Sequence, residues 1–144
     1  MKLGPRQVFP SRTRRGAAAV ECALVVPLLA IILLGMIEFG RAVMVKEILS
    51  NAARKGCRSA ALPLATNGGV QSDVNAVLSS HGLDTTSATI SIYVNDAAGS
   101  VLDADPGDKV SVQVSLPFSA ASWTGNFLLT NQSLASETLS MMKQ

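Results

Sequence analysis

The sequence has little of what enzymes and metal proteins use for chemistry. It has one histidine, two cysteines and only 4% aromatic residues among its 144 residues. It has no glycine-rich phosphate loop and no CxxC pair, and so lacks the usual nucleotide, zinc-ribbon and redox motifs. These shortages favour a structural protein over an enzyme, and we expect no cofactor and no metal.

Two polar clusters contain residue types that occur in active or metal sites. Residues 79–84 include two serines, the histidine and an aspartate, but neighbours in one short turn rarely adopt the geometry of a hydrolytic triad. Residues 103–108 include three aspartates, but their spacing lacks the glycine and the terminal glutamate of an EF-hand loop. We therefore expect a solvated helix end and an acidic turn.

The two cysteines are not expected to form an intramolecular disulfide. Cys22 and Cys57 are about 50 Å apart if one helix joins them, which is far beyond the reach of a disulfide. Because Val20 and Glu21 are not the small residues that precede a lipidated cysteine, Cys22 is expected to be a small apolar side chain that is buried. Cys57 is expected to be a free, partly buried thiol, with pairing to another chain as the alternative.

Charge is also scarce, at 15% of residues, and one long run has almost none. From Ala17 to Ile37 the only charged residue is Glu21, and from Cys22 onward there is none. About twenty such residues cross the hydrocarbon of a bilayer, so the run predicts a membrane span with Glu21 near one interface. Pro27 removes one backbone hydrogen bond from this helix, which membrane helices tolerate.

The residues around the run indicate how it sits in the membrane. A secretory signal peptide needs a shorter apolar core and a small-x-small cleavage site soon after it, and neither occurs.

Five basic residues precede the run without any acid, and five follow it, diluted by Glu38 and Glu47. This difference favours a single-pass topology with the basic N-terminus inside and the C-terminal part outside.

The helical pattern continues beyond the apolar run. Apolar and small residues recur at spacings of three and four, which predicts an amphipathic helix. We expect one helix from about residue 17 to about residue 60, because the residue before Pro63 is disfavoured in a helix. The residues of the predicted apolar face are Val45, Ile48, Leu49, Ala52 and Gly56.

The remaining residues, 62–144, predict a small head of the α+β class. A short helix carrying Val70, Val74, Val77 and Leu78 should end at His81-Gly82. Alternating β-branched residues then predict an antiparallel sheet of about three strands. The expected strands are 89–94, 109–116 and 133–141, with a long exposed loop over 95–108 and an irregular stretch over 119–130 that holds Trp123 and Phe127.

The chain therefore divides into a basic leader (1–16), a transmembrane and stalk helix (17–61) and the head (62–144). The head carries seven acidic residues against two lysines, whereas the leader has only basic charges. An acidic surface disfavours nucleic acid as a partner of the head. It leaves contact with another envelope component as an expectation.

Several motifs of the N-terminal part occur together. An arginine-glycine pair ends the leader, a Val-Glu pair follows, and the apolar span contains a proline. Ile-Glu-Phe-Gly-Arg comes next, and Asn-Ala-Ala-Arg-x-Gly-x-Arg ends at Arg58. Residues 14–61 thereby resemble the TadE-like minor pilins of the tight-adherence (Tad) secretion system. Cys22 departs from the pattern, since the family commonly has an aromatic residue there.

The resemblance implies how the chain matures and where it resides. A prepilin peptidase would cut between Gly16 and Ala17, placing Glu21 at mature position five. Other pilins or pilus-assembly proteins would then be its partners, in the bacterial inner membrane or in a pilus. The alternative is an uncleaved single-pass membrane protein whose head binds or scaffolds an envelope component.

The resemblance also suggests a role for the carboxylate within the apolar run. A buried carboxylate is costly unless it is paired, and cleavage would create a cation, the α-amino group of Ala17. Glu21 of one subunit would meet this group of a neighbour when their helices pack with an axial offset. Alternatively, Glu21 only extends to the headgroup region and has no partner in another subunit.

Overall fold

The computed structural model describes residues 13–120 and 132–144 of the chain. Two units are distinguished, Met1–Met36 and Ile37–Gln144. Helix α1 (Thr13–Ala60) passes from the first unit into the second and continues through Pro27. The predicted long helix is confirmed; it begins four residues earlier than expected and ends just before Pro63.

The part of α1 in the second unit contributes to the core of that unit. Val45, Leu49 and Ala52 have no exposed surface, and Ile48 is 5% exposed. All four belong to one cluster with apolar residues of the second helix and the sheet. The predicted amphipathic face is thus confirmed, and it packs against the head residues.

Helix α2 (Asn67–Ser80) confirms the short predicted helix. The Thr66 side chain accepts a hydrogen bond from the backbone N–H of Gly69 and so caps its N-terminus. Val70, Val74 and Leu78 form its buried face. The helix ends at His81, and Gly82 follows in the left-handed conformation (φ 69°), as the His-Gly pair predicted.

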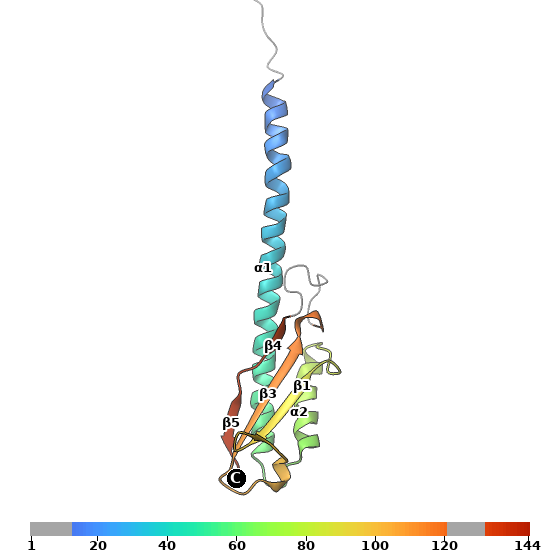
Figure 1. Ribbon diagram of the computed structural model, residues 1–144. Coiled ribbons are helices and arrows are strands. Elements are labelled where there is room, and N and C mark those ends of the chain that lie inside the picture. The colour runs from blue at the N-terminus through green and yellow to red at the C-terminus, as the bar shows by residue number, and fades with distance from the viewer. Residues whose placement is uncertain (1–12, 121–131) are drawn as a thin grey trace, which may run out of the picture. The chain divides into compact units, whose positions relative to one another are not determined.

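The sheet is antiparallel, as expected, but it has five strands and not three. The strand order is β2-β1-β3-β4, and β5 also pairs with β3 (Figure 1). β3 is the central strand because it pairs with β1, β4 and β5. The strands are β1 (Thr89–Val94), β2 (Ala97–Ala98), β3 (Lys109–Pro117), β4 (Ser133–Ala135) and β5 (Leu139–Met142).

The predicted third strand over 133–141 is wrong in one respect, because it is interrupted. Ser136 is buried, its N–H donates to the carbonyl of Val114 (2.8 Å), and its Oγ accepts from the N–H of Val114 (3.0 Å). A side-chain oxygen thereby takes the place of a backbone partner, as in a bulge. The ladder to β3 resumes only at Leu139, so one predicted strand becomes β4 and β5.

The predicted long loop over 95–108 also contains more structure than expected. Asn95 and Asp96 both have positive φ (51° and 65°) and turn the chain back at once, so that Ala97 and Ala98 pair with the end of β1. A single 3-10 turn, η1 (Val101–Asp103), follows. Asn-Asp lacks the glycine of the usual hairpin signal, and for this reason the sequence did not predict the turn.

The two faces of the sheet differ in chemistry. On β3, Val110, Val112 and Val114 have no exposed surface and face the core with α1 and α2. Figure 1 shows both helices behind the same face of the sheet in the second unit. The alternate residues, including Ser111 and Gln113, lie on the opposite, outer face. A 3-10 turn, η2 (Phe118–Ala120), follows β3, and the rest of the predicted irregular stretch, with Trp123 and Phe127, lies outside the described residues.

Candidate functional site

The apolar run of α1 is uncovered along its length. All side chains from Gly16 to Leu34 are exposed, and that of Leu24 keeps 72% of its surface. Soluble proteins rarely expose so large an apolar surface. By length and composition, Gly16–Ala60 is a helix that can cross a membrane, and its most apolar window has no burial inside the protein. The chain therefore fits a single-pass membrane protein.

Glu21 is the one acidic residue on this exposed apolar surface. Its side chain is exposed, and within the described residues it makes no salt bridge and no side-chain hydrogen bond. Cys22 beside it is also exposed, and so the protein does not supply the burial expected for it. A carboxylate at this place needs an interface, water or a cation from another molecule.

The predicted cleavage position lies inside the helix. An added Cβ at Gly16 would meet no atom within 4 Å, and its φ is not in the left-handed region. Neither helix packing nor backbone conformation therefore requires a glycine here. Pro27 lies in the same exposed stretch, and Ile37, the end of the predicted span, is the first residue of the second unit.

Glycine at position 56 has a packing role that the sequence pattern did not reveal. A Cβ there would lie 2.8 Å from Cγ2 of Val74 and 3.2 Å from Cγ1 of Val112. α1 thus comes close to both α2 and β3 at Gly56, inside the Asn-Ala-Ala-Arg-x-Gly-x-Arg motif. The available signal was a glycine within a helix, which costs about 1 kcal/mol relative to alanine and so indicates a close contact.

Cys57 is a free, buried cysteine. Its Sγ donates a hydrogen bond to the carbonyl of Leu139 (2.8 Å), which attaches the helix to β5. Burial raises the pKa of this thiol above its ordinary value, against a smaller opposite effect from a hydrogen bond with the Val112 backbone. A buried thiol with a raised pKa is a poor nucleophile, which suits a structural residue.

The serine and histidine residues at the C-terminal end of α2 are not arranged as a triad. Ser80 Oγ lies 3.1 Å from Nδ1 of His81, but that nitrogen also lies 2.9 Å from the carbonyl of Val77. Asp84 instead accepts hydrogen bonds from Thr86 and Ser87. These bonds, led by that from the Ser87 hydroxyl, lower the pKa of Asp84 from 3.8 to about 2. The cluster is a helix end followed by a capped turn.

The acidic 103–108 segment is stabilised from within the protein. Asp108 accepts a hydrogen bond from the side chain of Asn95 (2.9 Å) and another from the N–H of Asp105 (2.9 Å). These bonds lower the pKa of Asp108, with the Asn95 side chain as the largest cause. Among the described residues, no group of three or more His, Cys, Asp or Glu is placed to hold a metal ion.

The C-terminal residues join this segment to the rest of the head. The ammonium of Lys143, which is 7% exposed, donates to the carbonyl of Val101. The N–H of Lys143 donates to the carbonyl of Asp108 (2.8 Å), and the N–H of Gln144 donates to the carbonyl of Ala61 (3.0 Å). The end of α1 and the acidic segment are thus fixed by the same two residues.

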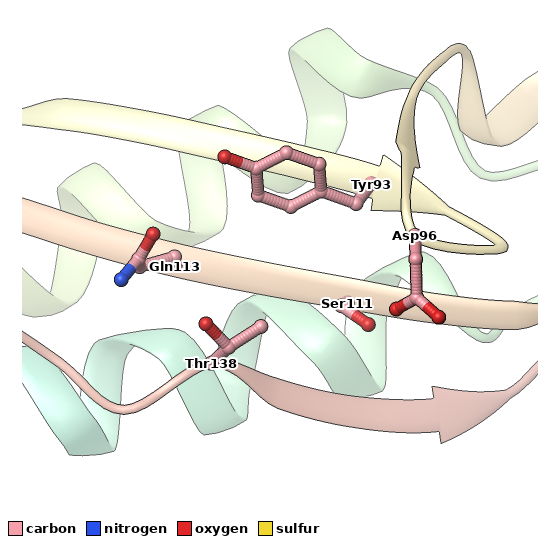
Figure 2. Close-up of a pocket in the computed structure, with 5 residues that line it drawn as sticks. All are labelled: Tyr93, Asp96, Ser111, Gln113 and Thr138. Atoms are coloured by element: carbon pink, nitrogen blue, oxygen red, sulfur yellow. The ribbon is translucent and has the colours of Figure 1, made fainter.

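A polar depression lies on the outer face of the sheet (Figure 2). It has a volume of about 210 Å³ and is open to solvent. The sequence predicted the strands but not this cluster, because the register that sets Tyr93 opposite Ser111 cannot be derived from alternation alone. Its lining residues are Tyr93, Asp96, Ser111, Gln113 and Thr138.

Comparison with protein families gives one match. The model of the family described as TadE-like protein matches residues 16–58. No curated protein and no solved structure matches the chain. The matched segment contains Glu21, the exposed apolar run and Gly56, and it ends before the head, residues 62–144. Residues 16–58 are therefore similar to the TadE-like family, which confirms the resemblance seen in their motifs.

Proposed function

We propose that this chain is a minor pilin or pseudopilin-like structural subunit of a Tad-type pilus assembly and secretion system. In this proposal a prepilin peptidase removes residues 1–16, and the mature chain assembles through its N-terminal helix. Its head has no enzymatic role. The observation that carries the proposal is the TadE-like segment itself, an uncovered apolar helix with a single carboxylate at the fifth position after Gly16.

The proposed mechanism of assembly is charge pairing inside a helix bundle. Cleavage gives Ala17 a positive α-amino group, and the apolar surface of α1 packs against helices of neighbouring subunits. Glu21 of one subunit then pairs with Ala17 of the next, where the low dielectric strengthens the attraction. The uncovered side chains and the absence of an internal ion pair at Glu21, among the described residues, support this proposal.

One observation favours the alternative of an uncleaved membrane protein with a scaffolding head. α1 begins at Thr13, so the bond between Gly16 and Ala17 lies within a continuous helix. A peptidase has to unwind a helix locally before it can cut. Under this alternative Glu21 stays at the membrane interface and the leader remains attached.

The N-terminal residue of the membrane-extracted protein distinguishes the two functions. We expect Ala17, and we expect Gly16→Leu to insert normally but to keep its leader. Because no atom lies within 4 Å of a Cβ at this position, the substitution leaves the packing intact. Gly40→Leu is the matched control, with an equally open site on the same helix. A wild-type chain that begins with Met1, or a Gly16→Leu chain that still matures, would contradict cleavage at this bond.

We further propose that the leader faces the cytoplasm and the head lies outside the inner membrane. A cysteine that replaces Leu102, which is 54% exposed, should react in intact cells with a maleimide that cannot cross membranes. A cysteine at Ser11 should not react; this variant also carries Gly16→Leu, so that the leader is retained. The buried Cys57 should remain silent in both. Labelling at Ser11 but not at Leu102 would reverse the topology.

A further inference from the structure

The outer-face depression combines one aromatic ring with several hydrogen-bonding groups. Figure 2 shows the ring of Tyr93 lying along the sheet with its face turned outward, and the side chains of Gln113 and Thr138 beside it. Tyr93 comes from β1, Gln113 from β3, and Thr138 directly precedes β5. Two strands of the sheet and the residue before a third thus present these groups on one surface.

The charges of the depression cancel. Asp96 is its only charged lining residue, and its carboxylate pairs with the ammonium of Lys109 at 2.8 Å. Both partners remain partly exposed, with 73% and 44% of their side-chain surfaces accessible. A net neutral site has no strong attraction for an anion or a cation. The carboxylate nevertheless keeps lone pairs that can accept hydrogen bonds.

Ser111 provides a second, independent observation. Its side chain is 1% exposed, and its Oγ has no hydrogen-bond partner among the residues that the structure describes. A buried hydroxyl without a partner is costly, and such groups in native proteins call for an explanation. Ser111 lines the depression, and Figure 2 shows it beside the carboxylate of Asp96. Because its Oγ has almost no surface open to water, a hydroxyl of a bound ligand, or a water that the ligand holds in place, would satisfy it after a rotation of the Ser111 side chain.

These features match one class of ligand. A pyranose ring has a flat face of C–H groups, which can lie on an aromatic ring, and hydroxyl groups around its edge. The depression offers the ring of Tyr93 for the face and amide, hydroxyl and carboxylate groups for the edge. It lacks the apolar walls that enclose most cofactors and drug-like ligands. We propose that the outer face of the sheet binds a neutral oligosaccharide, with Tyr93 as the stacking platform.

The site goes beyond the proposed pilus function and does not depend on it. A head outside the inner membrane would meet cell-wall glycans and surface polysaccharides, which share this pyranose chemistry. Binding itself requires only the folded sheet. It can therefore be measured with the purified full-length chain, whether or not that chain is cleaved or assembled.

The test measures saccharide binding by the full-length chain. The chain is held in lipid nanodiscs, because alkyl glycoside detergents would compete for the site. The neutral probes are chitotetraose, which carries N-acetyl groups as cell-wall glycans do, and cellotetraose, which lacks them. Polygalacturonate is the anionic probe. Saturation-transfer NMR reports contact with the sugar, and calorimetric titration gives the dissociation constant. We expect at least one neutral probe to bind and polygalacturonate to bind more weakly.

Substitutions assign the binding to the depression. Tyr93→Ala should weaken it by about tenfold or more, since it removes the stacking face, whereas Tyr93→Phe should retain most of it. Thr89→Ala is the matched control, because Thr89 lies on the same face of β1 outside the depression. If Tyr93→Ala does not fold, Gln113→Ala, expected to lose affinity, replaces it. The proposal is overturned if neither neutral probe binds with a dissociation constant below ~10 mM, or if polygalacturonate binds more tightly than both. It is also overturned if the folded Tyr93→Ala variant, or Gln113→Ala in its place, binds like the wild type.

Discussion

At the scale of single residues, several polar side chains of the head stabilise turns. Asp84 illustrates this, since its carboxylate accepts from Thr86 and Ser87, and these bonds lower its pKa to about 2. A carboxylate whose pKa is lowered on folding stabilises the folded state at every pH above its pKa in the unfolded chain, which is 3.8. That contribution is lost as the pH falls from 3.8 towards 2. The turn over residues 84–87 should therefore stay closed at pH 5 and open in this acidic range.

An NMR titration of the Asp84 carboxyl carbon checks this expectation. The wild-type midpoint should lie near 2, and Ser87→Ala should raise it towards 3.8, because the Ser87 hydroxyl is the largest cause of the shift. Ser79→Ala is the control, since its hydroxyl bonds the carbonyl of Ala76 and not Asp84. A wild-type midpoint near 3.8 would show that these hydrogen bonds do not form in solution.

At the scale of elements, Gly56 marks a tight contact of α1 with α2 and β3. Gly56→Ala places a methyl group 2.8 Å from Val74 and 3.2 Å from Val112, and valine side chains have little freedom to move away. Overpacking of this kind costs about 1–3 kcal/mol, which outweighs the gain in helix propensity of about 1 kcal/mol. We therefore expect a lower free energy of unfolding for Gly56→Ala.

Thermal unfolding of the full-length chain in one detergent measures this difference. Gly40→Ala is the matched control in the same helix, because a Cβ there meets no atom within 4 Å. Its midpoint should equal or exceed that of the wild type, while the midpoint of Gly56→Ala should fall. Equal midpoints for the two variants would mean that α1 does not pack on α2 and β3 as described.

The elements that the sequence predicted well are those whose signals are local. These are the apolar run, the capped helix α2 and the alternation in β1 and β3. Each of these signals is contained within a single short stretch of sequence. The interrupted strand depends instead on Ser136, which takes a backbone position opposite Val114, 22 residues away in sequence. Such long-range hydrogen bonds leave no periodic pattern, and for the same reason the outer-face depression was not predicted.

At the scale of the whole molecule, the described residues leave the apolar part of one long helix uncovered. Within the described residues, one face of α1 is buried from Glu38 onward, whereas all side chains from Gly16 to Leu34 are exposed. The sequence predicted both properties, because they follow from hydrophobicity and period. The proposed partner of Glu21, the amino group of Ala17 in a neighbouring subunit, could not be predicted from these patterns, since they describe one chain only.

The measurement that tests the central proposal most directly is co-purification of Glu21 variants with other pilus components from solubilised membranes. Glu21→Gln removes the charge at nearly constant volume, and Glu21→Leu makes the span more apolar, so both should insert at least as well as the wild type. Glu47→Gln is the control on the exposed side of α1. Loss of one partner from a buried ion pair costs about 3–5 kcal/mol, which is enough to lose assembly. We predict that both Glu21 variants are cleaved and abundant but no longer co-purify with other pilus components, whereas the Glu47 variant still does. Undiminished co-purification of Glu21→Leu would contradict assembly through this carboxylate.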